Sequence, residues 1–217
     1  MALFTPEGSL SYPKLFAPVL PKNAKPDDKR AWSTTVLFTE DDVKAKDEKG
    51  NAVWQSLVAA VVAKAKEDFP DASGKIEFDA KGESFMMAGK KVLKMPFRKN
   101  VAEKYAPEFV YWVNLRKTES DNSRPPQVVE RDTSPMVNKD RIYPGVRARA
   151  SVSVFSYKRS DNSGVSLGLN NVQRLGEGKR LDSYVNAKDE FGALDPEAAG
   201  DLGTVGGDDL SLKDMLG

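Results

Sequence analysis

Short alternating patterns of apolar and polar residues dominate the chain and predict a protein built mainly from β-strands. Between residues 31 and 38, apolar residues and threonine recur at every second position from Trp32 to Phe38, as one face of a half-buried strand requires. Further segments of strand character, each bounded by Gly, Pro, Asn or Asp, are residues 10–20, 75–82, 90–99, 107–117, 126–132, 146–159 and 165–175. Because Pro13 and Pro18 interrupt the first of them, we expect an edge strand or an irregular strand there.

One segment has the period of an amphipathic helix. Between residues 52 and 69, apolar residues recur at spacings of one, three and four, and Pro70 ends the pattern. Asn51 is the expected N-cap of this helix. Trp54 lies on the apolar face, so we assign it to the core.

Two local signals refine these elements. Thr39 followed by Asp42 fits a capping box at the start of a short helix, which Gly50 would end. Gly168 interrupts the last predicted strand and indicates a β-bulge or a bend. Together the elements predict an α+β fold, mainly β, in which a barrel or sandwich of strands carries one inserted helix.

The net charge of +1 hides a strong asymmetry along the chain. Residues 182–217 contain nine acids and two bases, a net charge of −7, so residues 1–181 carry +8. The Gly, Ala and Asp content after Leu181 is typical of a flexible linker. We therefore expect a folded domain over residues 1–181 and a flexible acidic tail over residues 182–217.

The residues that the chain lacks exclude several kinds of chemistry. With no Cys and no His there can be no disulfide, no Cys/His zinc site, no thiol nucleophile and no imidazole base. There is also no run of eighteen apolar residues and no charged-then-apolar leader. We therefore expect a soluble intracellular protein with no membrane contact, no metal and no other cofactor.

The strand predicted at residues 146–159 has two chemically different faces. Alternation places small and branched apolar residues on one face and Arg147, Arg149, Phe155 and Tyr157 on the other, with Lys158 at the end of the strand. Nucleic acid offers phosphates to guanidinium groups and flat bases to aromatic rings. The alternative interpretation is a solvated sheet face with incidental aromatic residues.

Two further segments add basic and aromatic residues. Within residues 107–117, Trp112 and Arg116 share a face opposite the apolar set. A second segment carries five bases, Lys90, Lys91, Lys94, Arg98 and Lys99. Three such segments in one β-rich domain of charge +8 favour nucleic-acid binding. Trp32 and Tyr143 are second choices for base stacking, because each could as easily belong to the core.

Single strands are the expected form of that nucleic acid. The helix at residues 52–69 has a mixed polar side and is not basic enough to enter a major groove. Aromatic side chains stack only on bases that are already unstacked, and each stack is worth about 1–3 kcal/mol. We expect a non-enzymatic protein that binds single-stranded DNA with little base preference.

A basic β-rich domain followed by an acidic tail resembles the phage-encoded single-stranded-DNA-binding proteins, and residues 163–196 are similar to the C-terminal part of one family of them. The resemblance implies an OB-fold, a five-stranded Greek-key barrel with extensions, whose open face takes the strand. It also implies a role in phage DNA replication or recombination in the cytoplasm of the infected bacterial host. In the general OB-fold the helix lies between the third and fourth strands, whereas here it follows the second predicted strand.

The end of the expected tail, GDDLSLKDMLG, combines acidic and apolar residues. Asp209 can cap a short helix with its apolar residues on one face. We expect the tail to compete with DNA for the basic surface and to recruit replication or recombination proteins. The residues expected to bind these partners are Asp208, Asp209, Leu212, Asp214, Met215 and Leu216. A purely solubilising tail is the alternative. Replication proteins with such tails often end in an aromatic residue, whereas this chain ends in Gly217.

Other classes of function stay open from the sequence alone. A strand-annealing recombination protein would share the basic surface but normally forms rings, whereas we expect a monomer or a weak homo-oligomer. Asp71, Asp79 and Lys81 superficially match a PD-(D/E)xK nuclease signature, in which two acids hold Mg²⁺ and a lysine steadies the attacking water. Their spacing is short for that signature. A virion structural protein would explain the strands but not the opposed charges.

Overall fold

The computed structural model describes residues 2–26, 28–71, 76–78, 85–87, 92–101, 104–120 and 123–183. The chain divides into two units, residues 1–182 and 183–217. The features below belong to the first unit. The predicted acidic tail from residue 184 onwards lies outside the described residues, as do Lys90 and Lys91.

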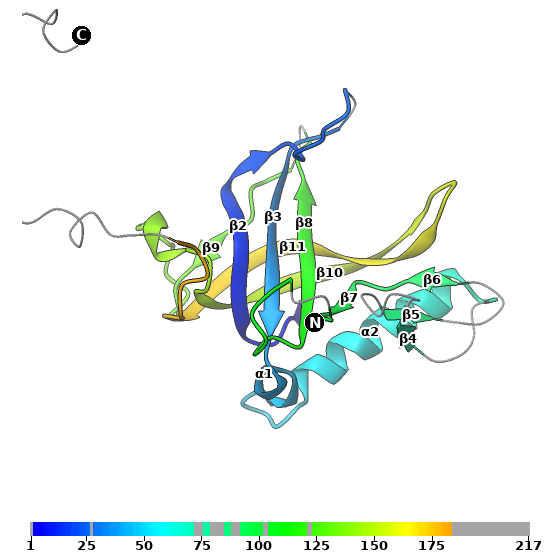
Figure 1. Cartoon of the computed structure of the whole chain (residues 1–217), viewed down its shortest axis with the longest axis horizontal. Helices are drawn as coiled ribbons and strands as arrows, with labels where there is room; N and C mark the ends of the chain where they lie inside the picture. Colours follow the sequence, from blue (N-terminus) through cyan, green and yellow to red (C-terminus); the bar gives the residue numbers. More distant parts are fainter. Residues whose placement is uncertain are drawn as a thin grey trace, which may run out of the picture. The chain divides into compact units, whose positions relative to one another are not determined.

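Five long strands form a closed barrel. In order around the ring they are β2 (Gly8–Val19), β3 (Ala31–Phe38), β8 (Tyr111–Thr118), β11 (Ser163–Gly176) and β10 (Arg147–Lys158). Pairing of β10 with the start of β2 closes the ring, and β8 and β11 run parallel while the other neighbours run antiparallel. Figure 1 shows β2, β3 and β8 side by side, with the long β10–β11 hairpin running across them. This is the Greek-key connectivity of the expected OB-fold.

Small and branched apolar residues fill the barrel, as the alternation in the sequence predicts. The buried residues of its strands include Val36, Phe38, Val113, Leu115, Ala148, Ala150, Val152, Val165, Leu167, Leu169 and Val172. The central strand β3 is buried on both faces, because Thr35 and Leu37 on its outer side are also covered. Packing on both sides of β3 makes it a rigid support for its neighbour β8.

The long helix α2 (Val53–Asp68) lies between the second and third barrel strands in chain order, as the sequence predicts. Its buried face consists of Trp54, Leu57, Val61 and Ala65, and the helix packs along β10 and β11 (Figure 1). The ring of Trp54 lies 5.1–5.5 Å from three other aromatic rings, which confirms its assignment to the core. The predicted cap is wrong, because the N-cap is Ala52 and the Asn51 side chain donates to Asp47 instead.

The short helix α1 (Glu40–Lys44) begins with the predicted capping box. The Asp42 backbone N–H donates to the Thr39 hydroxyl at 3.2 Å, and the Thr39 N–H donates to the Asp42 carboxylate at 2.9 Å. The helix ends at Lys44 rather than near Gly50, so that part of the prediction is wrong. Gly50, with φ +81°, belongs to a separate turn in which its N–H donates to the carbonyl of Asp47.

Short elements surround the barrel. They are β1 (Leu3–Phe4), β4 (Ile76–Phe78), β5 (Phe85–Met87), β6 (Leu93–Lys94), β7 (Phe97–Lys99), β9 (Val128–Val129) and the 3-10 helix η1 (Lys139–Arg141). Of the strand predicted at residues 75–82, the structure describes only residues 76–78, which form β4, and the strand predicted at residues 90–99 is divided into β6 and β7. A bulge or a bend is expected at Gly168, and the structure has the bulge two residues later: Ser151 faces Asn171 and Val152 faces Leu169, so the extra residue is Asn170.

Within the residues that the structure describes, no helix is long and apolar enough to cross a membrane.

Candidate nucleic-acid interface

The outer sides of β3, β8, β11 and β10 join into one surface, which we call the outer sheet face. Residues that pair directly across neighbouring strands point to the same side of a sheet. Ser33 of β3 pairs with Arg116 of β8, Arg116 pairs with Gly168 of β11, and Gly168 pairs with Ser153 of β10. The residues of the outer sheet face are Ser33, Thr35, Trp112, Asn114, Arg116, Ser153, Phe155, Ser166 and Gly168.

Gly168 brings two of the predicted binding residues together. A Cβ atom on Gly168 would lie 3.6 Å from the Cε1 atom of Phe155, so the Phe155 ring lies against the bare backbone of the glycine. That ring is 44% exposed. On the other side of Gly168, the exposed Arg116 donates from Nη2 to the carbonyl of Lys29 at 3.0 Å. An aromatic ring and a guanidinium group from distant strands therefore flank the same glycine.

Trp112 lies further along the outer side of β8 and is half-buried. The Lys104 Nζ atom lies 4.4 Å from its ring centroid, and the Tyr105 ring meets it edge-on at 5.8 Å and 72°. Arg98 of β7 pairs directly opposite Trp112. The other two tryptophans, Trp32 and Trp54, are only 4% and 8% exposed, so Trp112 is the most accessible of the three.

The side chain of Asn100 fastens the loop beside Trp112. Its Nδ2 atom donates to three backbone carbonyls between residues 105 and 109 at 3.0–3.3 Å, and its Oδ1 atom accepts from the Tyr105 N–H at 3.3 Å. The Tyr105 hydroxyl is hydrogen-bonded to Thr35, and burial raises the pKa of Tyr105. This loop covers the outer side of β3 and leaves Trp112 at the edge of the cover.

Tyr12 is an exposed aromatic residue that the sequence analysis missed. It is 68% exposed, and its φ of +48° lies in the left-handed region, which non-glycine residues rarely adopt. It follows Ser11, whose partner in the ladder is Thr35 of the outer sheet face. A strained backbone that displays an aromatic ring is typical of a functional position. The available signal was a tyrosine directly before Pro13 inside a strand.

Two loops frame the outer sheet face. The β2–β3 loop carries four exposed bases, which are Lys22, Lys25, Lys29 and Arg30, and the β10–β11 loop begins with the exposed Arg159. Arg30 pairs with Glu119 at 3.2 Å. In OB-folds the face of the second and third strands and these two loops bind oligonucleotides. The sequence of the first loop, PKNAKPDD, is typical of a turn and does not by itself indicate that its bases lie beside this face.

Arg147 is on the outer side of β10 but at the opposite end of the strand from Phe155, where it forms a structural ion pair. Both NH₂ groups of its guanidinium contact the Asp42 carboxylate, and its Nε atom donates to Glu7 at 3.1 Å. Asp42 is buried and also forms the capping box of α1. Arg147 therefore connects α1 and the N-terminal segment to the barrel, and its guanidinium is already bonded to two carboxylates. For this reason we leave Arg147, a predicted phosphate-binding residue, out of the proposed interface.

The other predicted residues on the hairpin are spread over two sides. Arg149 is exposed, lies 5.3 Å from the Phe4 ring and donates to Gln173 at 2.8 Å. Tyr157 is half-buried, on the same side of β10 as Phe155, with the Arg159 guanidinium 5.5 Å from its ring. Lys158 points the other way, because its ammonium lies 5.3 Å from the Phe69 ring at the end of α2.

The remaining candidates occupy different places. Lys94 is exposed on β6 and Lys99 is exposed on β7, both beside the barrel. The second choices have structural surroundings, because Trp32 is buried and the Tyr143 hydroxyl donates to Glu177 at 2.7 Å.

The nuclease alternative falls largely outside the described residues. Asp71 is exposed, whereas Asp79 and Lys81 are not described. Among the residues that the structure places, no group of three or more acids forms a metal site.

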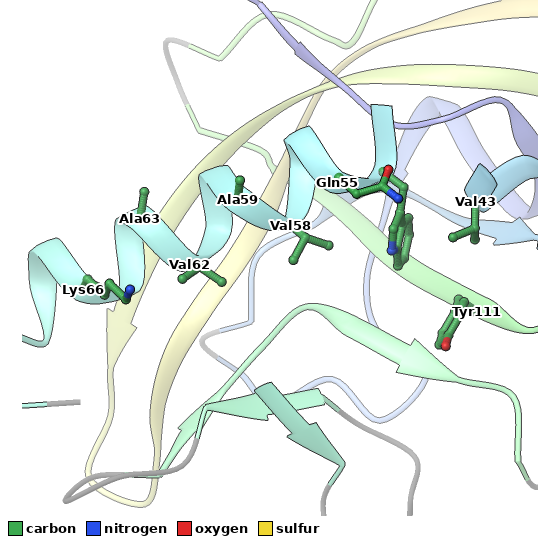
Figure 2. A pocket seen from close by; sticks show the side chains of 9 residues that line it. Val43, Gln55, Val58, Ala59, Val62, Ala63, Lys66 and Tyr111 are labelled. Atoms are coloured by element: carbon green, nitrogen blue, oxygen red, sulfur yellow. The ribbon is translucent and has the colours of Figure 1, made fainter. Parts of the chain in front are cut away.

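A second surface feature is an apolar groove of about 730 Å³ along α2. Figure 2 shows Val58 and Val62 pointing into it, with Tyr111 and Val43 near one end and Lys66 near the other. Among the described residues that line it, Lys66 is the one with a charge. Within that described lining, the groove lacks the pairing of bases and aromatic rings found on the outer sheet face, so we do not take it as the candidate nucleic-acid site.

Comparison with known structures identifies the fold. The chain is similar to the single-stranded DNA-binding protein from bacteriophage Enc34 in complex with ssDNA, with a TM-score of 0.58 and 13% identity, over 82% of this chain and 88% of that chain. It is also similar to gp2.5, a single-stranded DNA-binding protein encoded by bacteriophage T7, with a TM-score of 0.52 and 15% identity, over 85% of this chain and 97% of that chain. These similarities confirm the predicted OB-fold.

Comparison of sequences gives the family. No curated protein sequence matches the chain. Residues 1–202 match the model of a family described as the ssDNA-binding protein of Enterobacter phage Enc34. The family and the solved structures are described as binding proteins and not as enzymes. The predicted resemblance is thus confirmed over nearly the whole chain, which belongs to the Enc34-type phage ssDNA-binding protein family.

Proposed function

We propose that the chain binds single-stranded DNA across the outer sheet face, with bases stacked on Trp112 and Phe155 and phosphates held by Arg116 and Arg98. The observation that carries this proposal is the position of Gly168 between Arg116, its partner on β8, and the Phe155 ring, which lies against the glycine from β10. The glycine keeps the surface open between a base-stacking ring and a phosphate-binding group. Membership of a family named for ssDNA binding supports it.

Further predicted residues extend this interface at its margins. Tyr157 and Arg159 continue it toward the hairpin loop, and Arg149 lies six residues before Phe155 on the same strand, about 20 Å away along β10. Lys94 and Lys99 add positive charge beside the barrel. The sequence pattern adds Lys90 and Lys91, which lie outside the described residues, and Lys158, whose ammonium lies near the Phe69 ring. Tyr12 supplies another exposed ring next to Ser11.

The proposed contacts carry little base preference. Stacking on an aromatic ring tolerates every base, and a phosphate contact contains no sequence information. The polar residues of the outer sheet face largely bond to protein groups: the Thr35 hydroxyl donates to Asn114 at 2.7 Å and the Ser153 hydroxyl donates to Asn170 at 2.8 Å. We therefore infer sequence-nonspecific coating of single strands.

The biological setting follows from this activity as part of the same proposal. The protein acts as a monomer or weak homo-oligomer in phage DNA replication or recombination, in the cytoplasm of the infected host. Its acidic tail, of net charge −7, competes with DNA for the basic surface and, when displaced, recruits replication or recombination proteins. Strand annealing is the alternative activity, and a ring-shaped assembly on DNA would favour it.

Anisotropy titrations of labelled oligo(dT) test the interface. Phe155→Ala is expected to weaken binding about 5- to 150-fold, which corresponds to the loss of one stacked base. Arg116→Ala is expected to lower the salt dependence, the slope of log K against log salt, by about 0.7, which corresponds to the loss of one phosphate contact. The matched control is Arg141→Ala, because Arg141 is exposed on η1 and pairs with Glu130 away from the face.

The outcome that would overturn the interface is equal behaviour of Arg116→Ala and Arg141→Ala at all salt concentrations. With Mg²⁺ present, a gel run after the titration is expected to show intact DNA. Shortened DNA would instead return attention to Asp71, Asp79 and Lys81.

A further inference from the structure

Lys104 lies where a stacked base would have to go. Its ammonium is 4.4 Å from the centroid of Trp112 and 5.4 Å from that of Tyr105, so the cation sits over two rings at once. Both distances are within the range of a cation–π interaction. Lys104 forms no ion pair with any described residue, so the two rings are its partners in the described part of the chain.

The Trp112 ring already has two neighbours in the structure. Tyr105 forms a T-shaped pair with the indole, at an interplanar angle of 72°, and the Lys104 ammonium lies over the indole ring. Stacking uses the flat face of a ring. A base stacked on the face that Lys104 covers and the Lys104 ammonium therefore exclude one another.

The loop can release Lys104 without unfolding. Asn100 holds the backbone from Tyr105 onwards, and the hydrogen bond between the side chains of Tyr105 and Thr35 fixes that ring. Lys104 comes immediately before the fastened part and is exposed. Its side chain has rotatable bonds along four carbons and can turn away while the cover of β3 stays in place.

We propose that Lys104 exchanges partners when DNA binds: its ammonium leaves the face of Trp112 to a base and binds a phosphate beside that base. This inference rests on the proposed function. In the free protein the lysine covers the accessible indole, and in the complex it neutralises the strand that displaced it. Lys104 thus covers the stacking position in the free protein and attracts the DNA phosphates in the complex.

The exchange predicts two opposite effects of Lys104→Ala. Loss of the phosphate contact weakens binding in a salt-dependent way, with a slope lower by about 0.7. Loss of the competing cation–π contact strengthens binding about two- to fivefold at every salt concentration. The plots of log K against log salt for wild type and variant should therefore cross, at about 0.1–0.4 M salt if the counterion contribution vanishes near 1 M.

The test uses the full-length protein and labelled oligo(dT), with Lys104→Ala compared with Lys22→Ala. Lys22 is exposed in the β2–β3 loop, and the described structure shows no aromatic ring beneath its ammonium. The expected results are a crossing for Lys104→Ala and no crossing for Lys22→Ala. Acrylamide should also quench the tryptophan emission of free Lys104→Ala more than that of wild type, and a Trp112→Phe background should abolish the difference.

Two failures are distinguishable. If wild type does not bind oligo(dT), the proposed function fails and the exchange fails with it. If wild type binds but Lys104→Ala is weaker at every salt concentration, with unchanged acrylamide quenching, the interface stands and the exchange alone is overturned.

Discussion

Replacement of Arg147 by methionine tests whether this arginine stabilises the fold or binds DNA. Methionine keeps much of the aliphatic packing and removes the charge. The substitution leaves the Asp42 carboxylate, whose side chain is 10% exposed, without its guanidinium partner. Removal of one partner from a buried ion pair costs about 3–5 kcal/mol. Arg147 itself is 23% exposed and Asp42 keeps the N–H of Thr39, so we expect about 3 kcal/mol, the lower end of that range.

This loss is large enough to measure by thermal unfolding. For a domain of this size, 1 kcal/mol lowers Tm by about 2–4 °C, so Arg147→Met should unfold about 6–12 °C below wild type. Adding Asp42→Asn removes the stranded charge and should recover part of the loss. The affinity for oligo(dT) at 20 °C should stay within about twofold of wild type, with an unchanged salt slope, because no phosphate contact is lost.

Arg149→Met is the matched comparison, because Arg149 is on the same face of the same strand but exposed. It should leave Tm within about 2 °C of wild type, as expected for a surface substitution. Its salt slope should fall by about 0.7 if the interface reaches that end of β10. An Arg147→Met protein with wild-type Tm and a reduced salt slope would refute the reasoning and return Arg147 to the DNA contacts.

Three further predictions concern other parts of the chain. Gly168→Val should push the Phe155 ring out of place and weaken oligo(dT) binding as much as Phe155→Ala does, without loss of Tm; unchanged binding would disprove the role of the glycine. Gly145→Ala should destabilise the protein by about 2–3 kcal/mol, since φ is +108° and a Cβ would lie 2.0 Å from the Lys179 carbonyl oxygen, and chemical denaturation measures this. Truncation after Asp195 should strengthen binding at low salt and have little effect at high salt; equal affinities at low salt would argue against a competing tail.

The outer side of β10 shows how far a periodic pattern predicts a site. Alternation places Arg147 and Arg149 on one face, and the structure agrees. The pattern does not contain the partners of Arg147, because Glu7 and Asp42 come 140 and 105 residues earlier in the chain. One of two equivalent-looking arginines is therefore paired and the other exposed, and only the tertiary structure separates them.

The fold could be predicted where the hydrophobic periodicity is clear and where Gly, Pro, Asn or Asp residues mark the ends of the elements. The long strands and the helix at residues 52–69 follow from hydrophobic spacing, and so does the helix position after the second strand. The pairing of β8 with β11 did not follow from the pattern, because parallel neighbours are distant in sequence and carry no turn signal between them. The resemblance to OB-fold proteins implies a five-stranded barrel, and the structure shows which strands pair. The placement of Arg116 and the Phe155 ring on either side of Gly168 depends on that pairing.

Loop residues of the interface had no periodic signal. Lys104 reaches Trp112 because Asn100 fastens the loop next to it, a set of contacts that no spacing rule encodes. Pro13, next to Tyr12, indicates only an interrupted strand, so the sequence gives no sign that the Tyr12 ring is exposed. In both cases, the backbone is irregular. Its conformation cannot be predicted from the spacing of residues, and it is this conformation that exposes the side chain.

The most direct test of the account is a tryptophan fluorescence titration of the full-length protein with unlabelled oligo(dT), run beside Trp112→Phe. Trp32 and Trp54 are buried, so DNA stacked on the outer sheet face should quench Trp112 almost alone. The account predicts salt-sensitive quenching in wild type that disappears in Trp112→Phe, whose affinity stays measurable by anisotropy. Tight binding with no quenching in wild type, or with the same quenching in both proteins, would contradict it.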